Sequence, residues 1–259
     1  MGVKLDRKIK LGCVNFLNAC PLIYPLKSGL LPHPFEIHMD VPSALVAGLR
    51  NGALDVALAS TGALLRLGDD FSYIPGIGIC SDGSVQSVVI CHAGDIENLA
   101  HLYLDPASVT GNILAKIILD KKYNIRPQFL PVDKGPVNIA SLKTGEGCVL
   151  IGDNALEAGA EEHGCIDMGE AWRELTGLPF IYALWTGRRE FITDEVRVPL
   201  YNSYLMGVSM IPRIISSYTR LPLEPGDAVK YLEENLIYEV TDEAEAGLEL
   251  FLKFAEEYI

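Results

Sequence analysis

The feature that most constrains the fold is a regular alternation of strand-like and helix-like segments in the first quarter of the chain. Short apolar runs rich in β-branched residues, or alternating with polar ones, predict strands at residues 9–16, 35–41 and 55–59. Between and after them, helical spacing predicts helices at residues 22–27, at 42–51 and around 61–67. Such a β-α-β-α order implies an α/β fold with a mostly parallel sheet, whose ligands bind at the carboxyl ends of the strands.

A second set of similar elements follows, with residues around Gly76 and Gly78 expected to form a loop between the two sets. Its predicted strands and helices are strands 85–91, 101–105, 128–132 and 148–153 and helices 110–121 and 136–142. Two amphipathic helices are predicted in the tail, around residues 229–236 and 248–259. We therefore expect two lobes, residues 1–92 with 186–259 and residues 93–185, with a ligand cleft between them.

Charge excludes several classes of partner. The chain holds 34 acidic against 21 basic residues, a formal net charge of −13, so it lacks the basic surface that nucleic acids and anionic membranes require. No apolar run reaches the roughly 18 residues of a membrane span. An anionic ligand would need a site made locally positive against this global charge.

The cysteines and histidines do not form a metal-binding pattern. Six cysteines occur without a CxxC pair and five histidines without HxxxH spacing, so we expect no metal. Lys8 and Lys10 precede an apolar stretch ending at Cys20, as in a lipoprotein signal, but Asn15 and Asn18 interrupt it. We expect a cytoplasmic protein with reduced thiols.

Several common catalytic motifs are absent. The sequence has no GxGxxG after a strand, no GxxxxGK[ST] and no GxSxG. Dinucleotide binding, P-loop phosphoryl transfer and α/β-hydrolase chemistry are therefore disfavoured. A reaction without a cofactor, or simple binding, remains.

Small polar residues gather at the predicted strand ends. They are Asn18, Ser60, Thr61, Ser87, Ser108, Thr110 and the adjoining Gly111. Hydroxyls and free backbone NH groups at helix starts bind anions without net positive charge, so a carboxylate ligand would fit. Taken singly, each residue is more readily explained as a helix cap or turn residue.

Other polar and aromatic residues each allow a functional and a structural interpretation. Asp153 is a base or ligand anchor, or the cap of a following helix. Arg188 and Arg189 either bind a carboxylate or form a solvated charge pair. The aromatic residues are expected to pack in the core rather than stack on a ligand; they are Trp172, Phe180, Tyr182 and Trp185.

In several ordered segments the chain resembles the menaquinone-biosynthesis family of the futalosine pathway. The matching segments are residues 12–22 (GCVNFLNACPL), 52–57 (GALDVA), 81–90, 149–156 (VLIGDNAL) and 172–180. The resemblance implies a two-lobed, type II periplasmic-binding-protein-like fold that works as an enzyme without metal or organic cofactor. Within the family it favours the branch that dehydrates chorismate to 3-[(1-carboxyvinyl)oxy]benzoate. It implies that Asn18 and Ser87 are catalytic, with Asn18 orienting the substrate or its leaving hydroxyl and Ser87 near the proton transfer.

One segment departs from the family pattern. Members usually carry Ser-Arg-Thr-Ser at the start of the second-lobe helix, whereas this chain reads Ser108-Val109-Thr110-Gly111. The two hydroxyls and the backbone NH groups can still hold a carboxylate, and Gly111 allows close backbone approach. Two alternatives therefore stay open: a small-carboxylate solute-binding or sensor protein of the same fold, and the family's later-step 1,4-dihydroxy-6-naphthoate synthase.

Overall fold

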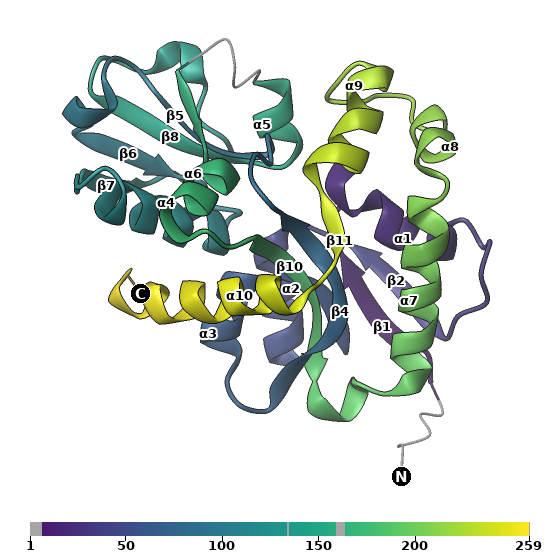
Figure 1. Cartoon of the computed structure of the whole chain (residues 1–259). Coiled ribbons are helices and arrows are strands. Elements are labelled where there is room, and N and C mark those ends of the chain that lie inside the picture. The colour runs from purple at the N-terminus through teal and green to yellow at the C-terminus, as the bar shows by residue number, and fades with distance from the viewer. Residues whose placement is uncertain (1–6, 134, 159–163, 259) are drawn as a thin grey trace. The chain divides into compact units, whose positions relative to one another are not determined.

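The chain divides into two compact units, each described here by itself. The computed structural model (Figure 1) describes residues 7–133, 135–158 and 164–258. The first unit contains the residues up to Cys80 together with Tyr182–Thr241, and the second contains Ser81–Ile181 together with the chain from Asp242 onward. These limits differ from the expected ones at residues 92 and 185, and the last helix belongs to the second unit rather than the first.

The first unit is built on a six-stranded sheet of order β11-β4-β10-β3-β1-β2. Its strands are β1 (Ile9–Cys13), β2 (Phe35–Met39), β3 (Val56–Ser60), β4 (Phe71–Ser81), β10 (Phe180–Arg188) and β11 (Ile237–Glu239). β1 runs parallel to both β2 and β3, whereas β10 is antiparallel to β3 and β11 is antiparallel to β4. The sheet is therefore mixed, and the expectation of a mostly parallel sheet holds only for β1, β2 and β3.

The helices of the first unit follow the strand ends. They are α1 (Cys20–Lys27), α2 (Pro42–Asn51), α3 (Leu64–Leu67), α7 (Asp194–Val208), α8 (Ile211–Ser216) and α9 (Pro225–Lys230). α2 begins at Pro42 and ends at Asn51, as predicted, and the following Gly52, with a φ of 75°, is its left-handed C-cap. α7 packs closely on α1, because a side chain at Gly207 would overlap the carbonyl oxygen of Pro21.

The second unit is built on a five-stranded sheet of order β7-β6-β8-β5-β9. Its elements are β5 (Val88–His92), β6 (His101–Leu104), β7 (Gln128–Pro131), β8 (Glu146–Ile151), β9 (Cys165–Asp167), α4 (Val109–Lys121), α5 (Asp153–Glu157), α6 (Met168–Thr176) and α10 (Asp242–Ala255). β6 is parallel to β7 and β8, and β5 is antiparallel to β8 and β9. The carboxyl ends of β6, β8 and β9 and the start of β5 thus lie at one edge.

An aromatic cluster explains why the C-terminal helix joins the second unit. The ring of Trp172 on α6 meets those of Phe180 and Phe251 edge-on, at centroid distances of 5.2 and 6.3 Å. All three side chains are almost completely buried. These residues pack in the core, as predicted for Trp172 and Phe180, and the apolar face of α10 is buried with them.

Two predicted segments differ in the structure, and one strand was not predicted. The expected loop around Gly76 and Gly78 is the long strand β4, in which a side chain at Gly78 would lie 2.7 Å from the carbonyl oxygen of Ala183 on β10. The predicted helix at 136–142 is only a 3₁₀ turn, Ile139–Ser141. β10 was not predicted as a strand. Gly78 permits close strand approach, whereas Gly76 has a φ of 83° within the strand and nothing near its Cβ position.

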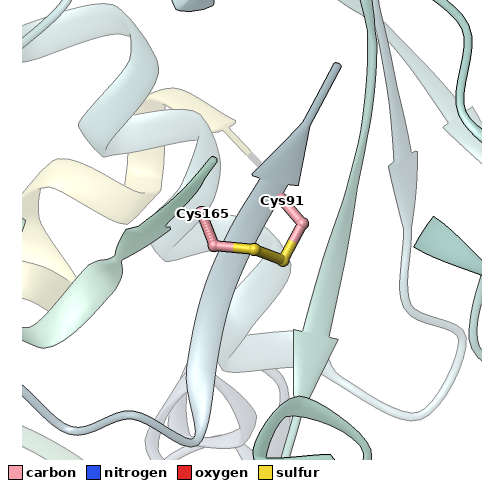
Figure 2. The surroundings of a disulfide bond; sticks show 2 residues. All are labelled: Cys91 and Cys165. Atoms are coloured by element: carbon pink, nitrogen blue, oxygen red, sulfur yellow. A yellow bond between two sulfur atoms is a disulfide. The ribbon is translucent and has the colours of Figure 1, made fainter. Parts of the chain in front are cut away.

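One pair of cysteines is oxidised, contrary to the expectation that all six are thiols. Cys91 on β5 lies directly opposite Cys165 on β9, and Figure 2 shows the disulfide between them. The four other cysteines are free thiols and are buried. Within the described residues, no helix combines the length and hydropathy that crossing a bilayer requires.

Candidate active site

Asn18 presents an unsatisfied amide oxygen in the first unit. It lies in the 3₁₀ turn Leu17–Ala19, between β1 and α1. Its Oδ1 atom is buried and has no hydrogen-bond partner among the described residues. Its backbone carbonyl accepts a hydrogen bond from the hydroxyl of Tyr238, at 3.0 Å. The backbone is therefore fixed by β11 while the side-chain amide is left available, and a buried unpaired acceptor is costly unless a ligand satisfies it.

Ser60 ends the strand next to β1. Its Oγ atom is also buried without a partner in the described part of the chain, so the predicted capping of the following helix by this side chain is wrong. Thr61 follows at the start of the 3₁₀ turn Thr61–Ala63 and is 1% exposed. Because β1 and β3 are parallel neighbours, Asn18 and Ser60 follow the carboxyl ends of adjacent strands.

A tryptophan adds a donor to the same sheet. Trp185 on β10 lies opposite Leu58 on β3. Leu58 is two residues before Ser60, so the side chains of Trp185 and Ser60 emerge on the same face of the sheet. The indole is completely buried, as predicted for a core residue, but its Nε1–H has no partner among the described residues. This unsatisfied donor could not be recognised from the sequence, because the strand that places it was not predicted.

Ser87 is the corresponding residue of the second unit. It is fully buried, and its Oγ has no hydrogen-bond partner among the residues that the structure describes. Its backbone carbonyl accepts a hydrogen bond from the Gly152 amide, at 2.7 Å, which fixes it beside the end of β8. Its own amide donates to the carbonyl of Val85 at 2.6 Å, around Gln86 with a φ of 59°. This is a tight turn with left-handed backbone at a non-glycine residue, a strained conformation that proteins keep mainly at functional sites.

Asp167 holds this turn in place. Its carboxylate accepts hydrogen bonds from the amides of Val85 and Gln86, the shortest at 2.6 Å, and from the hydroxyl of Ser84 at 2.9 Å. The same carboxylate caps α6 by accepting from the amide of Gly169 at 2.9 Å. Sequence reasoning missed Asp167, since its partners lie more than 80 positions away along the chain.

The α4 start lies against the same edge of the second sheet. Ser108 caps α4 by accepting a hydrogen bond from the Gly111 amide at 3.0 Å. A side chain at Gly111 would lie 2.7 Å from the Ser108 Oγ and 3.1 Å from Ile151 at the end of β8. Thr110, the second residue of α4, is 4% exposed. The glycine that departs from the family pattern therefore permits close packing of this helix start on β8.

Asp153 is the first residue of α5 rather than its cap. The cap position is taken by Gly152, whose φ of 58° suits glycine. Ser87, Gly152 and Asp153 are thus adjacent through the Gly152–Ser87 hydrogen bond, and Ile151 connects them to Gly111. The second unit therefore brings together all of its predicted site residues at one sheet edge.

A buried carboxylate lies at the end of the neighbouring strand. Asp105 follows β6, is 5% exposed and accepts a hydrogen bond from the Ala107 amide at 2.8 Å. Burial raises the pKa of Asp105, although this hydrogen bond opposes the shift. The Asn112 side chain accepts a hydrogen bond from the Asp105 amide at 3.0 Å and donates one to the Asp105 carbonyl at 2.8 Å. These two bonds fix the loop that leads into α4.

The two arginines are engaged on the surface of the first unit. Arg188 lies 3.8 Å from Asp70 and 4.9 Å from the centre of the Phe71 ring. Arg189 donates to the carbonyl of Asp69 at 2.8 Å. These contacts favour the interpretation of Arg188 and Arg189 as surface charges over that of carboxylate-binding groups.

Comparison with known proteins finds relatives with the same name in two bacteria. A chorismate dehydratase of Thermus thermophilus is 28% identical over 71% of each chain, and one of Campylobacter jejuni is 24% identical over 93% of this chain and 95% of its own. The Candida albicans CA3427 product, described as having the generic periplasmic binding protein structural fold, matches with a TM-score of 0.63 at 11% identity, covering 96% of this chain and 90% of its own. This chain has that periplasmic-binding-protein-like fold, with two mixed sheets.

A family model described as "Menaquinone biosynthesis" matches residues 9–257, which include every candidate site residue named above. The chain belongs to the menaquinone biosynthesis family.

Proposed function

We propose that this protein is a chorismate dehydratase, which removes water from chorismate to give 3-[(1-carboxyvinyl)oxy]benzoate. The observation that carries the proposal is that Asn18 Oδ1 and Ser87 Oγ are buried polar atoms without partners in the described part of the chain. These are the two side chains to which the family resemblance assigns the chemistry. Family membership and the names of the two relatives support the same reaction.

The reaction needs a proton acceptor and help for a leaving group. The ring carbon that bears the enolpyruvyl ether loses its proton, and its electron pair becomes part of the aromatic ring. The neighbouring carbon loses its hydroxyl, which departs as water with the proton that the ring carbon released and the proton acceptor passes on. Since aromatisation supplies the driving force, neutral hydrogen-bonding groups are sufficient assistance.

Asn18 is assigned to the leaving hydroxyl. An amide oxygen that accepts a hydrogen bond from this hydroxyl fixes the orientation of its carbon–oxygen bond relative to the proton that is removed. The hydrogen bond from Tyr238 to the Asn18 carbonyl keeps the amide in one position. Orientation of this kind lowers the activation free energy by several kcal/mol in enzymes, because the entropic cost of aligning the reacting groups is met when the substrate binds.

Ser87 is assigned to the proton transfer. A serine hydroxyl without an adjacent base is itself a poor proton acceptor. The structure gives Ser87 Oγ no partner among the described residues, so we assign the proton to a carboxylate of the substrate and give Ser87 the task of holding that carboxylate. The strained turn at Gln86 fixes where the hydroxyl points.

The remaining polar residues are assigned to substrate binding. In the first unit these are Ser60 and Thr61, and in the second unit they are Ser108, Thr110, Gly111 and Asp153. Hydroxyls and amides at the α4 start suit a carboxylate, whereas Asp153 suits a substrate hydroxyl. A cytoplasmic location remains a prediction.

Steady-state kinetics with chorismate test the assignment. Asn18→Ala and Ser87→Ala are each expected to lower kcat at least about a hundredfold, in the range lost with one positioned catalytic group. Ser209→Ala, an exposed serine whose hydroxyl bonds only within its own helix end, is the matched control and should keep wild-type kinetics. Equal activity of all four proteins would contradict the assignment.

The second candidate is a small-carboxylate binding or sensor protein, favoured by Val109 and Gly111 in place of the usual arginine and serine. It predicts that chorismate raises the unfolding temperature without being consumed. Formation of 1,4-dihydroxy-6-naphthoate from its own precursor, with no action on chorismate, would instead identify the later-step synthase.

A further inference from the structure

A cavity of about 380 Å³ lies within the first unit and does not include Asn18, Ser60 or Thr61. It is lined by residues from the end of β1, one face of α1, the end of β2 and the segment after α8. The α1 residues that line it are Cys20, Ile23, Tyr24 and Lys27, whose spacing of three and four places them on one face of the helix. Its size is within the range of small-molecule sites.

The lining is positively charged, against the charge of the whole chain. Acidic residues outnumber basic ones in this protein by 34 to 21, yet no acidic residue of the described chain lines the cavity. Lys27 does line it, and this ammonium group has no ion pair or hydrogen bond among the described residues. An unpaired lysine in an acidic protein makes this cavity attractive to anions.

Hydroxyl groups lie next to this charge. Tyr24 exchanges hydrogen bonds with Ser217 and Ser28, which lower the pKa of Tyr24, and the charge of Arg213 lowers it further. Thr219 adds a third hydroxyl-bearing aliphatic residue. The Ser217 hydroxyl already donates to the carbonyl of Ile214 at 2.6 Å, so the lining groups that suit a carboxylate are the Lys27 ammonium and the Thr219 hydroxyl.

Apart from Asn15, the rest of the lining is apolar or aromatic. Val14, Ile23 and Met39 line the cavity from β1, α1 and β2, and the ring of Tyr218 lines it from the segment after α8. A site with a few placed polar groups and an apolar remainder selects a ligand with one charged end and one hydrophobic body.

We propose that this cavity is a second ligand site, which binds a small ring-bearing monocarboxylate through Lys27, with the ring against Ile23 and Met39. This site goes beyond the proposed dehydratase reaction and does not depend on it. Phe16 and Cys20, on either side of Asn18, both line the cavity, so an occupant contacts the segment that carries the candidate catalytic amide. The ligand is thereby placed to influence Asn18 without competing for its side chain.

Methyl NMR of the full chain, with ¹³C-labelled methionine, tests the site directly. The chain has five methionines, and among those that the structure describes Met39 is the one that lines the cavity, while Met168 lies in the second unit. Titration with 3-hydroxybenzoate is expected to shift the Met39 methyl signal, assigned by Met39→Leu, through the ring current of the bound probe. The neutral benzamide should bind at least about tenfold more weakly, since the charge-assisted bond to Lys27 is lost.

Variants separate this site from the candidate active site. Lys27→Gln should weaken the Met39 response about tenfold and Lys27→Arg should keep it, whereas Lys8→Gln, an exposed lysine of the same unit outside the cavity, should have no effect. Asn18→Ala and Ser87→Ala should retain the response. A Met39 signal that does not move at millimolar probe, or that moves equally in Lys27→Gln, would overturn the proposal whether or not the protein acts on chorismate.

Discussion

The carboxylate of Asp167 accepts a hydrogen bond from the backbone amide of Gln86 at 2.6 Å, and this single contact fixes the residue before Ser87. Asp167 ends β9 and caps α6, so the turn that presents the candidate catalytic hydroxyl is anchored to two elements far away in the sequence. A left-handed backbone at Gln86 needs such support, because it costs free energy that the surroundings must supply.

Replacing Asp167 by alanine is expected to lower both stability and kcat. Loss of the helix cap alone costs about 0.5–2 kcal/mol. Release of Val85 and Gln86 should also let Ser87 move, so kcat should fall by more than KM rises. Asn138→Ala removes a different side-chain cap of the second unit, with an acceptor distance of 3.0 Å, and should change stability without changing kcat. Parallel kinetics and urea unfolding check this, and unchanged kcat in Asp167→Ala would contradict the positioning role.

Tyr238→Phe is expected to loosen Asn18. The variant removes the 3.0 Å hydrogen bond to the Asn18 carbonyl and leaves a buried acceptor unsatisfied, which should cost about 1–3 kcal/mol. Activity should fall while the unit stays folded. The control is Tyr201→Phe, an exposed tyrosine on α7. Wild-type kinetics in Tyr238→Phe would show that Asn18 does not need this support.

Alkaline pH should destabilise the protein through its buried thiols. Burial raises the pKa of Cys80 to about 12, far above that of an exposed thiol. Below the pKa of the unfolded thiol, about 8.5, this thiol does not lower the free energy of unfolding. As the pH rises from there towards 12, the free energy of unfolding falls, because only the unfolded state releases the proton.

Each buried thiol of this kind lowers the free energy of unfolding by about 1.4 kcal/mol per pH unit over this pH range. Cys80→Ala should therefore flatten the pH dependence of the unfolding free energy above about pH 9, although it lowers the stability at neutral pH by leaving a small cavity. Urea unfolding between neutral and alkaline pH measures both effects. An unchanged slope in Cys80→Ala would contradict the assignment.

The Cys91–Cys165 disulfide should stabilise the second unit. It closes a loop with a sequence separation of 74, for which chain entropy predicts about 4 kcal/mol. Thiol titration in denaturant should find four free thiols before reduction and six after it, because four of the six cysteines are unpaired. Reduction should lower the unfolding temperature of wild type but not of a Cys91→Ser, Cys165→Ser double variant. Six thiols in the untreated protein would show that the bond does not form.

Local sequence patterns predicted the elements whose signals are local. The first three strands, the helix that Gly52 ends and the C-terminal amphipathic helix were all recognised from periodicity and caps. β4 was missed because Gly78, which allows it to lie close to β10, looks the same in sequence as a turn glycine. The antiparallel pairing of β10 with β3 depends on residues more than 100 positions apart and has no local signature.

The candidate site shows the same division. Small polar residues at strand ends could be named from the sequence, but not which of them would remain unpaired. Ser108 turned out to cap its helix, whereas Ser60, equally suited by type and position, does not. Asp167 and Tyr238 could not be found, because each acts on the site through a hydrogen bond to backbone that only the folded chain brings near.

The proposed removal of water makes the ring of chorismate aromatic, and proton NMR of purified protein incubated with chorismate follows this change. The ring signals of chorismate are expected to be replaced by those of a 3-substituted benzoate, while the enolpyruvyl vinyl signals persist. With Ser87→Ala, the ring signals of chorismate are expected to stay as they are. Chorismate that survives incubation with the folded wild-type protein would show that the chain is not a chorismate dehydratase.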